Sequence, residues 1–308
     1  MNMRDIASGL RFPEGPVACR DGSVIVVEIA AGRVTRIGND GNKNVIAETG
    51  GGPNGAAFGP DGRLYVCNNG GMRFFERDGL LLPGPARDDD RTTGWIDAID
   101  PATGAVETIY THCDGEPLKA PNDLVFDTSG GFWFTDHGKM RRRTRDVGAV
   151  YYATADGASI NQVLGHMDSP NGIGLSPGGD RLYVAETHPG RVWEFTIGAP
   201  GTIAPVPGPA PWLRGNLLAN PNGYCLLDSL AVDAAGRICV ASIPHALQCV
   251  APDGSSTQRI DMPDLMPTNI CFGTAGHKQA FVTLSAAGRL VAIDWPGGGT
   301  QLAFDDAS

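Results

Sequence analysis

One stretch of this chain predicts its fold: Pro121-Asn122-Asp123-Leu124-Val125-Phe126, followed closely by Gly130-Gly131-Phe132-Trp133-Phe134. Two short apolar runs separated by a glycine-containing turn are typical of a β-hairpin. The same arrangement occurs six times in the 308 residues, with a mean period of about 51. The residues in the middle of the second run of each unit are Ile25, Tyr65, Trp133, Tyr183, Cys239 and Phe281.

Six β-rich units of this length predict an all-β, six-bladed β-propeller that forms a single domain over residues 1–308. Strand-like runs lie before Pro13, at Leu290–Ile293 and at Gln301–Phe304. We therefore expect strands from both termini to close the last blade, which removes an exposed sheet edge. A pair of two-sheet sandwiches would explain the strands but not the regular spacing of the units.

The composition restricts the partners of the protein. The formal net charge of -10 argues against a nucleic-acid partner, because the phosphate backbone attracts positive surfaces. No stretch approaches the roughly 18 apolar residues of a membrane span, and residues 1–11 lack the pattern of a signal peptide. The seven cysteines are scattered and contain no C-x-x-C, which predicts reduced thiols. We expect a cytoplasmic monomer or weak oligomer that binds neither nucleic acid nor membranes.

One polar position precedes each hairpin turn at a nearly constant distance, 11 or 12 residues before the middle of the second run. In a propeller this position lies at the start of the innermost strand, beside the central channel. Six side-chain oxygens should therefore converge on one axis. The residues at this position are Glu14, Asn54, Asn122, Asn171, Asp228 and Asn269.

These two carboxylates and four amides, with no histidine or cysteine among them, are hard oxygen ligands. They predict a central site for one divalent cation, with Ca²⁺ first and Mg²⁺ or Mn²⁺ as alternatives, and they suit Zn²⁺ less well. Pro-Asn-Gly is also ordinary turn chemistry, which is the alternative explanation. Turn chemistry explains poorly why Glu14 and Asp228 take the same position.

Polar residues also follow the second strand of several units and should return to the same face. His137, Glu186 and His188 are the substrate-binding candidates among them, and either histidine could transfer protons near neutral pH. A satisfied loop histidine is the alternative. The basic run Arg141–Arg145 is either a solvated loop or a rim that attracts an anionic substrate.

Four motifs in order along the chain resemble the senescence marker protein/gluconolactonase family, which includes regucalcin, bacterial sugar lactonases and the related diisopropyl-fluorophosphatase. The resemblance covers nearly the whole chain. The motifs are Phe12-Pro13-Glu14-Gly15-Pro16, Pro121-Asn122-Asp123-Leu124-Val125-Phe126, Pro170-Asn171-Gly172-Ile173-Gly174-Leu175-Ser176-Pro177 and Asp228-Ser229-Leu230-Ala231-Val232-Asp233.

The resemblance implies a six-bladed propeller with one catalytic divalent metal, commonly Ca²⁺, in the channel. It implies that the metal ligands are Glu14, Asn122, Asn171 and Asp228. It also implies that Asp228 acts as general base or nucleophile. Asn122 is also expected to bind substrate, and Asn54 and Asn269 are expected to line the substrate pocket or to bind through water. The animal branch carries a substrate-binding arginine two positions before the third-blade asparagine, where this chain has Ala120, so its lactone need not be gluconolactone.

These observations predict a metal-dependent hydrolase that opens a lactone ring. The cation would polarise the carbonyl and a water would attack it. The same site could instead act on another ester or a phosphotriester, or carry out a lyase or isomerase step on a sugar acid. A non-enzymatic, metal-binding propeller is the third hypothesis.

Overall fold

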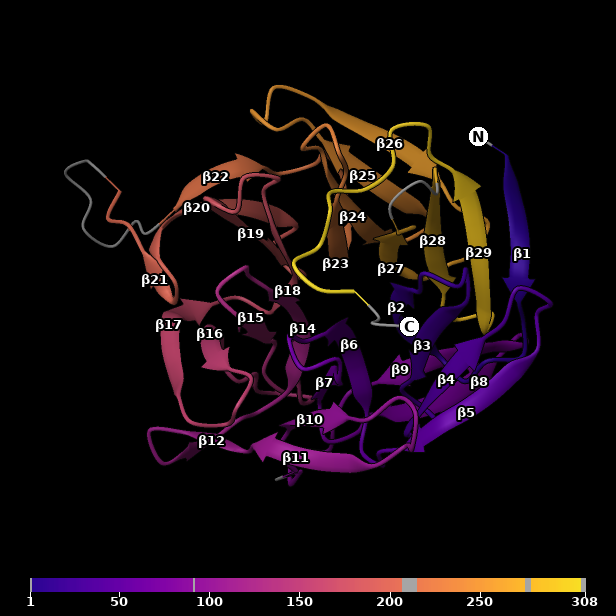
Figure 1. Ribbon diagram of the computed structural model, residues 1–308, viewed down its shortest axis with the longest axis horizontal. Helices are drawn as coiled ribbons and strands as arrows, with labels where there is room; N and C mark the ends of the chain where they lie inside the picture. Colours follow the sequence, from indigo (N-terminus) through magenta and orange to yellow (C-terminus); the bar gives the residue numbers. More distant parts are fainter. Residues whose placement is uncertain (1, 91, 207–214, 275–277, 306–308) are drawn as a thin grey trace.

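Six antiparallel sheets stand around a common axis in the computed structural model (Figure 1). The structure describes residues 2–90, 92–206, 215–274 and 278–305. All regular elements in these ranges are strands, and none of the described residues forms a helix that could span a membrane. The prediction of an all-β, six-bladed propeller is therefore confirmed.

The strands of each blade run outward from the channel. Blade one contains β2 (Pro13–Ala18), β3 (Val24–Glu28), β4 (Arg33–Ile37) and β5 (Lys43–Glu48). Blade two contains β6 (Pro53–Phe58), β7 (Leu64–Asn68), β10 (Trp95–Ile99) and β11 (Val106–Tyr110). Blade three contains β14 (Pro121–Phe126), β15 (Gly131–Asp136), β16 (Gly148–Thr154) and β17 (Ile160–Met167).

The second half of the ring repeats this order. Blade four contains β18 (Pro170–Leu175), β19 (Arg181–Glu186) and β20 (Arg191–Ala199), with β21 (Thr202–Ile203) and β22 (Asn216–Ala219) both paired to β20. Blade five contains β23 (Leu226–Val232), β24 (Ile238–Ile243), β25 (Ala246–Val250) and β26 (Thr257–Asp261). Blade six contains β27 (Pro267–Phe272), β28 (Gln279–Leu284), β29 (Arg289–Asp294) and, outermost, β1 (Met3–Ala7).

The two ends of the chain meet in blade six, where β1 pairs with β29 and Met3 lies opposite Ile293. The strand expected at Gln301–Phe304 does not form. Residues 299–305 instead cross the channel end at which the inner strands finish (Figure 1). There the Thr300 amide donates to Val232 O (3.0 Å), and the ring of Phe304 packs edge-on against Phe126 (5.8 Å between centroids).

The hydrophobic core lies between neighbouring blades. Side chains alternate along β15, so that Phe132 and Phe134 pack toward blade two while Trp133 packs toward blade four. All three are fully buried, and burial of each such side chain contributes about 1.5–3 kcal/mol. The aromatic and aliphatic side chains of the second strands, which reveal the repeat in the sequence, therefore pack between neighbouring blades and hold them together.

Two small hairpins are inserted into the ring: β8 (Arg73–Arg77) with β9 (Leu80–Gly84), and β12 (His112–Cys113) with β13 (Glu116–Pro117). The first of them folds over the face where the inner strands begin. Its Phe74 ring lies 5.0 Å from that of Phe12 at the start of blade one, and the Leu81 amide donates to Ala286 O (2.9 Å) in the turn between β28 and β29 of blade six. This hairpin therefore forms part of the wall above the channel.

Candidate metal and substrate site

Each inner strand begins with a register shift. In blade three, Pro121 pairs with Asp136, but the next regular pair is Leu124 with Phe134, so one extra residue lies on β14. The inner strands of the other five blades show a shift at the same level. Bulges of this kind re-aim side chains, and proline is tolerated at the first position of a strand. The Pro-Asn-Gly segments are thus strand starts rather than turns.

The glycines after the polar position allow close contact between neighbouring inner strands. A Cβ atom at Gly55 would lie 2.6 Å from Asp123 Cα and 2.7 Å from Asn122 O. A Cβ atom at Gly172 would lie 2.7 Å from Asp228 O. Because no larger residue fits, glycine lets the backbones approach and brings the polar residues of successive blades together.

Five of the six predicted residues line one cavity of about 510 Å³: Glu14, Asn54, Asn122, Asn171 and Asp228. Blade six differs, because Thr268 rather than Asn269 directly follows the Pro267–Leu284 pair. Asn269 comes one residue later and is absent from the cavity lining among the described residues. Its Nδ2 donates to Glu14 Oε2 (2.7 Å), so it orients a predicted metal ligand.

The two amides of the predicted metal set differ in their hydrogen bonding. Asn171 Nδ2 donates to Thr187 Oγ1 (3.1 Å), which fixes its Oδ1 on the other side of the amide. Asn122 Oδ1 is buried and has no hydrogen-bond partner among the described residues. An unsatisfied buried carbonyl oxygen costs about 1–3 kcal/mol, so this atom fits a role as ligand.

The donor set also fits a hard cation. Two carboxylates and two amide oxygens suit Ca²⁺, and the two carboxylates would neutralise its charge. Among the described residues, no three His, Cys, Asp or Glu side chains form a metal-binding group, so a cation bound here would need amide oxygens such as those of Asn122 and Asn171.

A third carboxylate, Asp123, makes the centre strongly acidic. Burial and then repulsion from Glu14 raise the pKa of Asp123 to about 8. Burial raises the pKa of Glu14, and burial followed by repulsion from Glu14 raises that of Asp228. A bound cation would relieve this repulsion. The sequence analysis missed Asp123, although it occupies the place where Glu14, Asn54 and Asn171 are followed by glycine.

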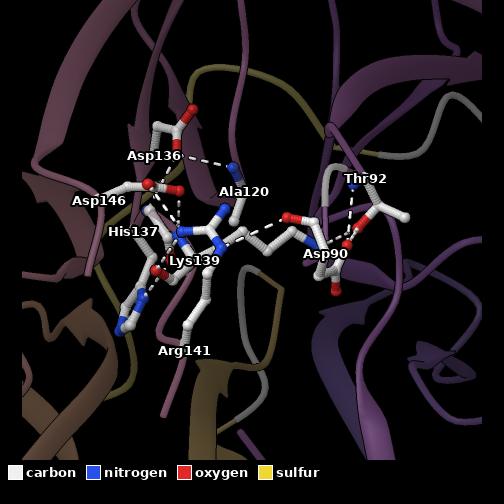
Figure 2. Close-up of polar contacts among 9 residues, drawn as sticks. Asp90, Thr92, Ala120, Asp136, His137, Lys139, Arg141 and Asp146 are labelled. Atoms are coloured by element: carbon white, nitrogen blue, oxygen red, sulfur yellow. Dashed lines mark hydrogen bonds and ion pairs between the residues drawn. The ribbon is translucent and has the colours of Figure 1, made fainter. Parts of the chain in front are cut away.

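The carboxylates that end β15 and β19 hold the backbone leading into the inner strands of blades three and four. Asp136 accepts hydrogen bonds from the amide of Ala120 (2.8 Å; Figure 2) and from that of Lys119 (2.7 Å). Glu186 accepts one from the Asp168 amide (2.6 Å) and is also bound by Arg191. Glu186 was predicted to bind substrate, but it lies outside the described cavity lining and its contacts position the strand start.

The residues that follow reach the cavity. His137 Nδ1–H donates to Gly138 O (3.0 Å), which leaves Nε2 as the acceptor nitrogen. Burial lowers the pKa of His137 to about 4, so its ring is neutral at physiological pH. His188 lies beside it, with 6.1 Å between ring centroids, and its buried Nε2 has no described partner. Both predicted histidines and Thr187 therefore line the cavity.

A polar wall that the sequence analysis missed adjoins His137 (Figure 2). Lys139 Nζ donates to Gly71 O (3.1 Å) and to Thr92 Oγ1 (3.0 Å), and the Thr92 hydroxyl donates to Asp90 Oδ1 (2.7 Å). Two arginines of the basic run are ion-paired: Arg141 with Asp146 and Arg145 with Asp168, both at 2.8 Å.

The molecule is thus one of the six-bladed propellers with an oxygen-rich pocket at the channel end where the inner strands begin. The chain belongs to the SMP-30/Gluconolactonase/LRE-like region family, whose profile matches residues 12–286.

Three relatives illustrate the breadth of this similarity. A gluconolactonase of Zymomonas mobilis is 25% identical over 88% of this chain and 76% of its own length. Lactonase drp35 of Staphylococcus haemolyticus is 28% identical over 74% of this chain, which spans 62% of that protein. The crystal structure of regucalcin from Agrobacterium tumefaciens, described as a calcium-binding protein, superposes with a TM-score of 0.71 at 18% identity, covering 95% of this chain and 92% of that one.

Proposed function

We propose that this protein is a metal-dependent hydrolase that opens the ring of a small lactone. The observation that carries the proposal is the meeting of Glu14, Asn122, Asn171 and Asp228 at one cavity, in a chain whose relatives are named gluconolactonase and lactonase. The unsatisfied Asn122 Oδ1 supports a cation ligand in particular.

Glu14, Asn122, Asn171 and Asp228 would hold one divalent cation, with Ca²⁺ first and Mg²⁺, Mn²⁺ or Zn²⁺ as alternatives. When bound, it supplies Lewis-acid polarisation of the lactone carbonyl and stabilises the developing oxyanion. Asn269 would keep the Glu14 carboxylate oriented through its 2.7 Å hydrogen bond.

Asp228 would accept the proton of the attacking water, because it is a carboxylate at the cavity surface. The oxygen of this water bonds to the carbonyl carbon, the ring C–O bond breaks, and the proton passes to the leaving alkoxide, so that the product is a hydroxy acid. His137 is the second candidate base, since its neutral ring has Nε2 as acceptor. Asn54, Asn122 and His188 would position the substrate at the cavity wall.

The structure gives all seven cysteines as thiols rather than disulfides, which agrees with reducing surroundings and supports a cytoplasmic location. A small lactone or ester remains the proposed partner, and we propose a monomer or weak oligomer.

A panel of lactones, assayed by acid release with a pH indicator in the presence and absence of a chelator, tests this function. We expect chelator-sensitive acid release from at least one lactone and its recovery on adding Ca²⁺. If no lactone gives such release while a phosphotriester, an aromatic ester or a sugar acid is turned over, the same site performs the alternative reaction.

A further inference from the structure

We propose that Lys139 binds a carboxylate substituent of the substrate, so that this site takes lactones carrying a carboxylate beside an apolar skeleton. The inference rests on the proposed lactonase function and adds the chemical class of the substrate. Nothing in the repeat pattern singles out Lys139, which lies in the loop after β15.

Lys139 is held rigidly in the wall of the cavity. The residue is 6% exposed, yet it lines the cavity. Asp146 fixes its backbone from both sides, because the Lys139 amide donates to Asp146 Oδ2 (3.2 Å) and the Asp146 amide donates to Lys139 O (3.1 Å). Asp146 is itself held by Arg141 at 2.8 Å (Figure 2). The ammonium is therefore held at one position in the cavity wall.

The Lys139 ammonium lies among neutral hydrogen-bond partners. Its two hydrogen-bond partners, Gly71 O and Thr92 Oγ1, are neutral, and no described residue forms an ion pair with it. An ammonium has three protons to donate, so one remains for a ligand. Burial lowers the pKa of Lys139, whereas the nearby Asp90 favours its charged form. A buried cation without an ion pair gains most from an anionic ligand.

The cavity also has an apolar wall. It is formed by Phe12 and Ile29 at blade one and by Met266 at blade six, which pack with Phe74 and Leu81 of the hairpin. All three of these lining side chains are apolar. The hydroxyl groups of a polyol would lose hydrogen bonds against this wall, whereas a hydrocarbon skeleton would be favourably buried. Ala120 adds no polar side-chain atom near Lys139.

Binding measurements test the proposal independently of turnover. Calorimetry with Ca²⁺ present would compare tetrahydrofuran-2-carboxylate with the neutral tetrahydrofurfuryl alcohol. Lys139→Met removes the charge, and Lys139→Gln removes it but keeps hydrogen-bond donors for Gly71 and Thr92. We expect both variants to weaken carboxylate binding roughly 10- to 100-fold with little change for the alcohol, and Lys139→Arg to restore most of the affinity. Arg73→Met is the matched control, since Arg73 is an exposed cation at the same cavity.

Hydrolysis provides the second arm, with 5-oxotetrahydrofuran-2-carboxylate compared with γ-butyrolactone. We expect Lys139→Gln to raise KM for the carboxylated lactone alone. The inference is overturned if both Lys139 variants bind the carboxylate as wild type does, if the loss is equal for the two ligands, or if Arg73→Met has the same effect. Absence of hydrolysis by the wild type, with Lys139-dependent binding intact, would instead refute the lactonase function alone.

Discussion

Asn122 illustrates how the site depends on single atoms. Its Oδ1 is buried without a partner in the described structure, whereas Asn171 is bonded to Thr187 and Glu14 to Asn269 and the Gly15 amide. A protein tolerates a buried oxygen without a partner when a ligand binds to that oxygen. The residue type and its position could be predicted from the repeat. Its missing partner could not, because hydrogen bonding depends on side chains from other blades.

Asp228→Asn tests the assigned base and ligand. We expect turnover to fall roughly 100-fold or more, because the variant loses a proton acceptor and a negative ligand. The metal-free variant should unfold at the same temperature as wild type or higher, since one of three repelling buried carboxyl groups is removed. Steady-state kinetics and calorimetry measure both effects, and turnover like that of wild type would contradict the assigned role.

The raised pKa of Asp123 predicts how stability depends on pH. In the metal-free protein burial and then Glu14 raise this pKa from 3.8 to about 8, so between these values the folded state binds a proton that the unfolded chain releases. The free energy of unfolding therefore falls as pH rises through this interval. We expect Ca²⁺ to raise the Tm of chelator-treated protein more at pH 8 than at pH 5. A larger increase at pH 5 would contradict this explanation.

At the scale of elements, the start of each inner strand is the functional unit. The second strands could be predicted well, because the apolar runs and turns follow local rules. The start of blade six was harder to predict. The distance to the middle of the second strand pointed to Asn269 as the polar position. In the structure Thr268 follows the Pro267–Leu284 pair, and Asn269 instead donates a hydrogen bond to Glu14. Lys139 and the β8–β9 hairpin also escaped prediction, because they belong to insertions without a repeating pattern.

Gly55→Ala tests the close approach of inner strands. The new Cβ would lie 2.6 Å from Asp123 Cα, so a backbone must move. We expect a loss of about 1–3 kcal/mol in the free energy of unfolding, together with weaker Ca²⁺ binding. Gly297→Ala is the control, because a Cβ there meets nothing within 4 Å. Equal stability and Ca²⁺ affinity in the two variants would show that the approach is not needed.

At the scale of the whole molecule, the ring is closed by pairing of β1 with β29 in blade six. Deleting residues 2–7 would expose the edge of β29 and the apolar surface that Met3, Ile6 and Ala7 contact. We expect a loss of roughly 2–4 kcal/mol in stability and concentration-dependent association through the open edge. Calorimetry and light scattering measure these effects.

Asp5→Ala is the control for this deletion, because it removes only the exposed ion pair with Arg289 at 2.6 Å. Such a pair contributes about 0–1 kcal/mol, so the variant should remain near wild-type stability. A deletion that stays monomeric and equally stable would contradict the structural role of β1.

The ring brings residues more than two hundred positions apart to one cavity, where we propose that they bind one cation. A crystal structure of the protein soaked with Ca²⁺ would reveal this ion. We expect a single ion about 2.3–2.6 Å from side-chain oxygens of Glu14, Asn122, Asn171 and Asp228. A structure with no ion at these four residues, from protein whose lactone hydrolysis survives chelation, would show that they do not form a catalytic metal site.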